Sequence, residues 1–400
     1  MPLRSISGTT SASRAAPGAG CPTRLTRLPG CVPERLHASV RARRRRAHCP
    51  AACVYAPCVA PVRDALPQRV RRWHRGMPMK WYVRLTWWLL RTLGALPLPL
   101  LYALGTALGR ALWWRRHARE RVHTEVNMGI VHPELDAAAR AVLVRACLAE
   151  TGRAVTEMAA VWGRGARRAL QLVHEVQGQA YFDAALQSGR GLIIAAPHLG
   201  CWELLNYWLC ARTPIAILYA PPRNPAWEAL LVRARGGLAP EQVRADGAGV
   251  RRLYKRLAAG GVVGILPDQQ PKRGEGHFAP FFGLAANTMV LLPRIAQRTG
   301  ATVLFAFAER LPRGAGFRVH ILPAPPGIAD ADLEVACGAL NRGVEACVKL
   351  AFPQYQWVYK RWAERPDPQA HDPYWLARHG LTEASARARN LRNRTGPPPR

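Results

Sequence analysis

His198 and Glu203 are the residues whose types and spacing first suggest chemistry. They stand in the stretch GLIIAAPHLGCWELLNYWL, residues 191–209, between an apolar run and a helical pattern. Such a run is typical of a buried strand, and the apolar residues after Glu203 recur at helical spacing. A histidine at this junction can act as a general base when a carboxylate orients its ring and stabilises the imidazolium. The spacing therefore predicts a base and its orienting carboxylate, with a surface pair of no catalytic role as the alternative.

The segments around this junction predict a mixed α/β domain. Apolar runs predict strands at 191–196, 215–219, 262–266, 302–308 and 317–322. Helical patterns predict helices at 136–163, 202–211, 225–234, 248–259, 288–299 and 331–350. This alternation indicates a largely parallel sheet covered by helices, in which ligand sites collect at the carboxyl ends of strands. The catalytic domain is expected at residues 122–365, and the polar residues 366–400 are expected to form a disordered tail.

The first 76 residues differ in composition from the rest of the chain. They hold fifteen arginines and two acidic residues, and no apolar periodicity lasts through them. We interpret residues 1–76 as a basic segment that is disordered or not native, because Met77 and Met79 directly precede the first patterned sequence. A metal-binding knuckle is the third alternative, and it lacks paired Cys-x-x-Cys spacing with matched histidines.

Residues 77–121 predict a membrane-anchoring helical segment. Thr92 to Gly109 are eighteen uncharged residues, with tryptophan pairs and basic residues on both sides. Tryptophans at both ends are typical of membrane interfaces. Eighteen helical residues span about 27 Å, barely a hydrocarbon core, so spanning and half-immersed arrangements both stay open. The arginines at 115–121 predict that the following domain lies on the cytoplasmic side.

The chain is strongly basic. Its formal charge is +32, of which residues 77–400 keep +19. A charge of this size indicates an anionic partner: nucleic acid, a membrane surface or an acidic protein. The arginines are spread along the chain and are not interleaved with aromatic residues on one face, so no nucleic acid is expected. The cysteines after residue 76 show no disulfide framework, which favours a reducing, cytoplasmic setting.

Several motifs, in order, resemble the lipid A late acyltransferases, the lauroyl and myristoyl transferase family of the lysophospholipid acyltransferase superfamily. The H-x-x-x-x-E motif of that family stands here as HLGCWE, residues 198–203. The resemblance continues in LYAPPRNPAWEALLVRARGG, residues 218–237, and in GILPDQQPKRGEGHFAPFFGLAANT, residues 264–288. It ends in PQYQWVYKRW and covers roughly residues 78–365.

The resemblance implies an acyl carrier protein-dependent O-acyltransferase on the cytoplasmic face of a bacterial inner membrane. A fatty acyl group would pass from acyl carrier protein to a hydroxyl of a lipid A precursor, with His198 as the base and Glu203 holding its ring. Arg235 is the candidate for stabilising the oxyanion or binding a substrate phosphate. Asp268 is the candidate for ordering the basic groups of the site. The structural alternatives are a solvated arginine and a turn cap before Pro271.

The resemblance also bears on cofactors and partners. Acyl transfer from a thioester needs no metal and no organic cofactor. An acidic acyl carrier protein, the phosphates of lipid A and the inner leaflet of the membrane account for the positive charge of the chain.

Other functions stay open. A related acyltransferase could use the same residues on another glycolipid or on an aminolipid. A glycerophosphate-type acyltransferase would carry aspartate in place of Glu203 and a PEGTR-like motif that this chain lacks. A basic nucleic-acid-binding protein is the alternative from a different class, suggested by a pI of about 11.2. A salt-sensitive DNA shift by residues 77–400 would support it.

Overall fold

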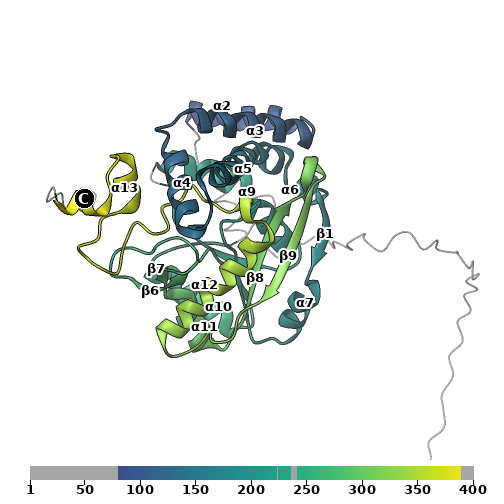
Figure 1. Cartoon of the computed structure of the whole chain (residues 1–400). Helices are drawn as coiled ribbons and strands as arrows, with labels where there is room; N and C mark the ends of the chain where they lie inside the picture. Colours follow the sequence, from purple (N-terminus) through teal and green to yellow (C-terminus); the bar gives the residue numbers. More distant parts are fainter. Residues whose placement is uncertain (1–79, 223, 236–240, 389–400) are drawn as a thin grey trace, which may run out of the picture. The chain divides into compact units, whose positions relative to one another are not determined.

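A computed structural model describes residues 80–222, 224–235 and 241–388 (Figure 1). These residues all belong to the second of the two units of the chain, Val59–Arg400. The predicted basic segment, residues 1–76, lies outside the described residues.

The domain is built on a seven-stranded sheet. Its strand order is β1-β9-β8-β2-β5-β3-β4, and every neighbouring pair is parallel except β8 and β9. A separate antiparallel hairpin joins β6 and β7. The strands are β1 Val173–Gln177, β2 Leu192–Ala195, β3 Ile215–Tyr219, β4 Glu241–Arg244, β5 Val262–Ile265, β6 Gly276–Phe281, β7 Leu284–Met289, β8 Thr302–Arg310 and β9 Phe317–Pro323.

Helices precede, separate and follow the strands. The helices before β2 are α2 Trp81–Gly94, α3 Leu98–Trp114, α4 Arg119–Val131, α5 Ala137–Met158, the π-helix η2 Ala159–Gly163, α6 Ala166–Leu170 and α7 Gln179–Gln187. The later ones are α8 Trp202–Cys210, α9 Pro225–Arg235, α10 Gly247–Ala258, α11 Leu291–Thr299, α12 Leu333–Leu350, α13 Pro373–Arg378 and α14 Glu383–Ala388. The short 3-10 turns are η3 Pro312–Gly314 and η4 Phe352–Gln354.

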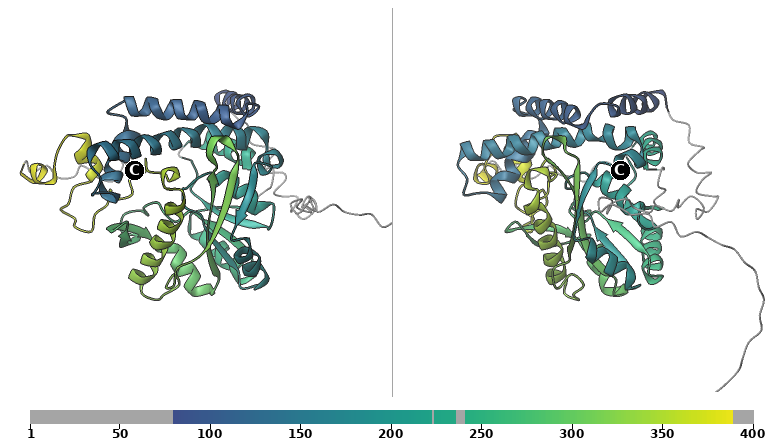
Figure 2. Two further views of the ribbon diagram at one scale, coloured as in Figure 1. Left: turned by 45° about the vertical axis from the view of Figure 1, so that its right-hand side comes forward. Right: turned by 90° about the vertical axis from the view of Figure 1, so that its right-hand side faces the viewer.

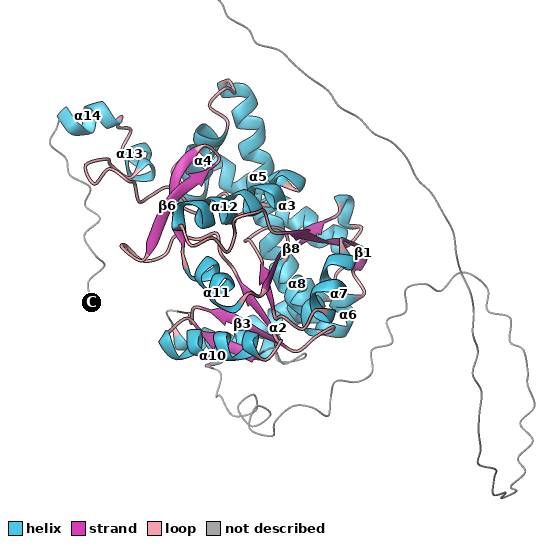
Figure 3. Ribbon diagram, turned by 90° about the horizontal axis from the view of Figure 1, so that it is seen from below, coloured by secondary structure: helices cyan, strands magenta, loops and turns pink. Residues whose placement is uncertain are grey.

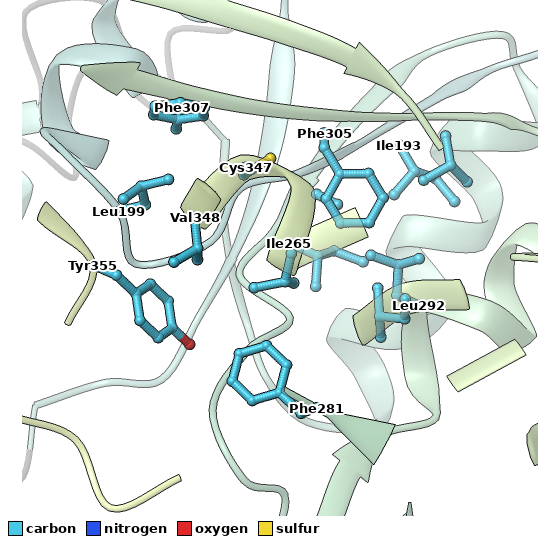
Figure 4. Packing of buried hydrophobic residues seen from close by; sticks show 14 of the residues in the cluster. Ile193, Leu199, Ile265, Phe281, Leu292, Phe305, Phe307, Cys347, Val348 and Tyr355 are labelled. Atoms are coloured by element: carbon cyan, nitrogen blue, oxygen red, sulfur yellow. The ribbon is translucent and has the colours of Figure 1, made fainter. Parts of the chain in front are cut away.

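The sheet has a hydrophobic core on each face, because successive side chains of a strand point to opposite sides. Ile193 of β2 packs into the core that α10, α11 and α12 cover, shown close up in Figure 4. Its neighbour Ile194 packs into the other core, with α7, α8 and η2. Figure 3 shows the strands between these sets of helices. Burial on both faces explains why the central strands are continuous apolar runs.

The predicted α/β class with a largely parallel sheet is confirmed. The five predicted strands correspond to β2, β3, β5, β8 and β9, with ends that differ by at most two residues. The strands β1 and β4 and the hairpin β6–β7 were not predicted. The helix predicted at 288–299 begins later, as α11 at Leu291, because Asn287 and Thr288 lie within β7.

The prediction of a disordered tail is wrong for residues 366–388. This stretch contains α13 and α14, and Asp372 caps α13 by accepting from the backbone N–H groups of Tyr374 and Trp375. Tyr374 is fully buried, and its hydroxyl donates to Asn127 on α4. The capping aspartate and the buried aromatic ring hold this stretch against α4.

The apolar segment Thr92–Gly109 does not form one helix. Helix α2 ends at Gly94, and α3 begins at Leu98 after Pro97, whose ring and missing N–H suit a helix start and oppose a helix interior. Within the described part of the chain, no helix has the length and apolar character needed to cross a membrane.

Helix α3 packs tightly on α5 through small residues. A Cβ atom on Gly152 of α5 would lie 1.9 Å from the carbonyl oxygen of Gly105, and one on Gly109 would lie 2.3 Å from the carbonyl oxygen of Leu148. Figures 1 and 2 show α2 and α3 on the same side of the domain, with α5 beside α3. The outer face of α3 exposes Leu100 and Leu104.

We expect Gly152→Ala to destabilise the protein by about 1–3 kcal/mol, the usual cost of overpacking a close contact. The added methyl group would overlap backbone atoms of α3, so helices α3 and α5 would have to move apart. Thermal unfolding of the purified protein in detergent measures the change.

Gly129→Ala on α4 is the matched control. The nearest atom to its added Cβ is 4.0 Å away, so the better helix propensity of alanine should leave stability unchanged or slightly higher. Equal unfolding midpoints for the two variants would contradict the close packing of α3 on α5.

Candidate active site

His198 and Asp268 meet at the carboxyl edge of the sheet. His198 follows β2 and Asp268 follows β5, and these strands are parallel neighbours, so their carboxyl ends lie side by side. The Oδ1 atom of Asp268 is 2.8 Å from Nδ1 of His198, and its Oδ2 atom accepts the backbone N–H of His198 at 2.9 Å. One carboxylate therefore holds both the ring and the backbone of the histidine.

The Asp268 carboxylate is suited to stay ionised. Burial alone would raise the pKa of Asp268, but the charge and hydrogen bonds of His198 hold that pKa below its ordinary value. Burial, and after it the charge of Asp268, raises the pKa of Tyr355 well above its ordinary value, so this neighbouring phenol stays neutral. With Nδ1–H donated to a carboxylate, the Nε2 atom of His198 carries the lone pair that a general base needs.

The expected contact between Glu203 and the His198 ring is replaced by the contact with Asp268. Glu203 lies in the first turn of α8, and its buried carboxylate binds Nε of Arg235 at 3.0 Å, and also Nη2. The indole N–H of Trp162 donates to the same carboxylate at 3.3 Å. A helix turns about 100° per residue. Trp202 thus places its ring 5.6 Å from the His198 ring, while Glu203, one residue later, reaches α9.

Arg235 is not a solvated surface arginine. Its side chain is mostly buried against Glu203. Burial works to lower the pKa of Arg235, but the Glu203 carboxylate raises that pKa above its ordinary value. Two of its guanidinium nitrogens are bonded to Glu203. Arg235 and Glu203 therefore form a buried ion pair, in addition to the hydrogen-bonded pair of His198 and Asp268.

The turn between His198 and α8 is held from two sides. The backbone N–H of Gly200 donates to the carbonyl of Gln354, and that of Cys201 donates to the carbonyl of Ala308. The backbone N–H of Gln356 donates to the carbonyl of His198 at 3.0 Å. Gly200 has a φ of +60°, and a Cβ atom there would lie 2.0 Å from the carbonyl oxygen of Ala308. Only glycine fits this close approach.

Two glutamines complete the surroundings of the imidazole. The Nε2 atom of Gln269 lies 3.3 Å from Nε2 of His198, and it also donates to Oε1 of Gln356 at 3.0 Å. Both glutamines stand in the motifs PDQQ and YQWVYKRW, but sequence reasoning assigned them no role. Their place directly after Asp268 and Tyr355 is the signal that could have found them.

The motif YQWVYKRW packs against the site. The Tyr359 hydroxyl accepts the backbone N–H of Gln270. Arg361 is buried and donates to the carbonyl of Asn287, while Lys360 pairs with Asp372 at 3.2 Å. These residues support the loop after β5. No group of three or more metal-ligating side chains gathers anywhere in the described ranges.

Comparisons with known proteins identify the family of the chain. The model of the family described as bacterial lipid A biosynthesis acyltransferase matches residues 69–364. The lipid A biosynthesis lauroyltransferase of Escherichia coli is 27% identical over 274 residues, covering 68% of this chain and 88% of that protein. The lipid A biosynthesis palmitoleoyltransferase of the same species is 26% identical, covering 68% of this chain and 87% of that protein.

A relative with a different acceptor in its name is also similar. The phosphatidylinositol mannoside acyltransferase of Mycobacterium tuberculosis is 31% identical over 159 residues, which cover 38% of this chain and 49% of that protein. The family model spans well over half of the chain, from before α2 to two residues beyond the motif YQWVYKRW. The chain therefore belongs to the bacterial lipid A biosynthesis acyltransferase family.

Proposed function

We propose that the protein transfers a fatty acyl group from acyl carrier protein to a hydroxyl of a lipid A precursor, at the cytoplasmic face of the inner membrane. The observation that carries the proposal is the His198–Asp268 pair at the carboxyl edge of the sheet, with Nε2 of the ring turned away from its carboxylate. Membership of the family supports the acceptor class, and the names of the relatives describe lauroyl and palmitoleoyl transfer.

The geometry supports a general-base mechanism. The Nε2 atom of His198 takes the proton of the acceptor hydroxyl as its oxygen attacks the thioester carbonyl. Asp268 keeps the ring in the tautomer that accepts at Nε2 and stabilises the imidazolium that forms. The imidazolium then returns the proton to the departing thiolate. Asp268 thereby takes the orienting role that the sequence suggested for Glu203.

Glu203 and Arg235 serve a different purpose in this proposal. Their buried ion pair fixes the first turn of α8 to the end of α9, beside the His198 turn. The Glu203 carboxylate neutralises the charge of Arg235, so the pair serves to position the two helices and not to bind a substrate phosphate.

The donor is proposed from charge. The strongly basic chain attracts an acidic carrier protein and the phosphates of lipid A. Both electrostatic attractions weaken as the salt concentration rises. The similarity to the phosphatidylinositol mannoside acyltransferase favours one alternative acceptor class, another membrane glycolipid.

We further propose that α2 and α3 rest in the membrane interface instead of spanning it. Large apolar side chains are exposed along both helices: Trp81, Leu85, Trp88 and Leu89 on α2, and Leu100, Leu104, Leu108 and Trp114 on α3. Trp81, Leu85 and Trp88, and likewise Leu100, Leu104 and Leu108, recur at spacings of three or four residues, which puts each set on one face of its helix. At the end of α3, a cavity of about 290 Å³ is lined by Arg110, Arg145 and Trp113, a composition that suits lipid phosphates.

Replacing Leu104 and Leu108 with glutamate should reduce binding to vesicles of anionic lipid at least tenfold, because the apolar face would then carry charge. Vesicle co-sedimentation measures the effect. Leu350→Glu on α12, an exposed leucine on another element, is the control and should bind like wild type. Undiminished binding by the α3 double variant would refute an interfacial role for α3.

Asp268→Asn and His198→Ala should each lower kcat by about 10²–10⁴-fold, the range for losing a positioned base or its correct tautomer. The double variant should be little slower than the slower single variant, since the two residues act as one unit. Initial rates on membranes, with acyl carrier protein thioesters and a tetra-acylated lipid A precursor, test this. The mass of the lipid product identifies both the acyl chain and the acceptor.

Coenzyme A thioesters of the same chain lengths are the control for the donor. Equal rates with both carriers would contradict dependence on acyl carrier protein. A wild-type rate no higher than that of His198→Ala would contradict the proposed function.

Glu203→Ala should lower the free energy of unfolding by about 3–5 kcal/mol, because it leaves the buried Arg235 cation without its partner. Chemical denaturation of the purified protein measures this loss. Glu134→Ala, which breaks an exposed pair with His132, should leave stability close to that of wild type. A Glu203 variant as stable as the Glu134 variant would show that the buried pair contributes little.

A further inference from the structure

The Gln269 side chain already contacts the atom that would take the proton. Its amide nitrogen lies 3.3 Å from Nε2 of His198, on the side where an acceptor hydroxyl has to bind. The same nitrogen donates to Oε1 of Gln356, whose backbone N–H in turn donates to the His198 carbonyl. The amide is therefore held beside the imidazole by a second residue that is itself fixed to the histidine turn.

Each backbone N–H group of the histidine turn, residues 198–201, is already hydrogen-bonded within the protein. The N–H of His198 is bonded to Asp268, and that of Leu199 to the carbonyl of Pro197. The N–H groups of Gly200 and Cys201 are bonded to Gln354 and Ala308. Acyl transfer requires a donor for the negative oxygen of the tetrahedral intermediate. The four amides from 198 to 201 cannot supply it without breaking the turn.

Arg235, the donor suggested by the sequence, is also engaged. Its Nε and Nη2 atoms are bonded to the Glu203 carboxylate. Using them for an oxyanion would separate a buried ion pair, which is costly. The Gln269 amide carries no charge and gives up only its contact with His198 when a hydroxyl takes that place.

We propose that Gln269 is a further catalytic residue, whose side-chain N–H donates to the oxyanion during acyl transfer. The proposal rests on the acyltransferase function proposed above. The acceptor oxygen bonds to the thioester carbon, its proton passes to Nε2 of His198, and the C=O π pair becomes the oxyanion. The oxyanion and the attacking oxygen are bonded to the same carbon atom, so the Gln269 amide, displaced by the hydroxyl, can reach the oxyanion. As the carbonyl re-forms, the C–S bond breaks and the thiolate takes the proton from His198.

The test compares Gln269→Ala with wild type, His198→Ala and Gln270→Ala, using full-length protein in membranes with the donor and acceptor given above. Gln269→Ala should lower kcat by about 10²–10³-fold and leave the KM for the lipid acceptor unchanged, because the lost bond forms only in the transition state. Gln270 is the matched control: its side chain bonds the backbone of Lys360 and Glu364, so Gln270→Ala should lose far less of kcat.

Gln269→Glu should change the pH profile of kcat/KM, which a purely structural role of Gln269 would leave unchanged. It preserves side-chain shape, but a carboxylate beside Nε2 favours the imidazolium. The acidic limb of the kcat/KM profile should therefore shift to higher pH, together with a loss of kcat at least as large as that of Gln269→Ala.

Three results would overturn the role of Gln269: a kcat for Gln269→Ala within threefold of wild type, an effect confined to KM, or an equal loss in Gln270→Ala. If wild type does not exceed His198→Ala, the acyltransferase proposal itself fails, and the role of Gln269 fails with it.

Discussion

A buried ion pair between Arg310 and Glu157 supports the turn on which the candidate site is built. Arg310 ends β8, and its guanidinium binds both carboxylate oxygens of Glu157 at 2.7 and 2.8 Å. The same group donates to the carbonyl of Gly200 at 2.8 Å. Burial works to lower the pKa of Arg310, but Glu157 raises it above its ordinary value, so the arginine stays charged. Removing one partner of such a pair typically costs about 3–5 kcal/mol.

The His198–Asp268 and Glu203–Arg235 pairs of the site both depend on this support. Glu157 lies near the end of α5, where the helix continues as the π-helix η2 and brings Trp162 to Glu203. Arg310 also exchanges hydrogen bonds with Gln354: its backbone N–H donates to the side chain, and its carbonyl accepts from it. The backbone of Gln354 then accepts the N–H of Gly200. One buried cation thereby ties α5, β8 and the segment before Tyr355 to the turn that carries His198.

The sequence predicted the elements with strong apolar patterns and did not predict the partners of their polar residues. The central strands are buried on both faces, so their apolar runs are distinctive. The strands β1 and β4 lie at the sheet edges, and their short sequences mix apolar residues with polar and charged ones. His198 could be identified from its place after β2. Its partner could not, because the choice between Glu203 and Asp268 depends on where α8 begins and on which strand neighbours β2. Neither fact is encoded in residue spacing along one segment.

The antiparallel pairing of β8 with β9 has a consequence for how the protein is made. Since β9 runs away from the edge of the sheet at which His198 lies, the chain has to return along α12 before Gln354, Tyr355 and Gln356 reach the His198 turn. On α4, Asn127 is bonded to the carbonyl of Trp357, 230 residues later. Contacts between such distant segments form late in folding. Closing the long loop between them costs chain entropy before the contacts contribute any stabilising free energy. A nascent chain on the ribosome therefore carries its histidine and aspartate long before they have a finished site, and acquires that site only when its last quarter has emerged.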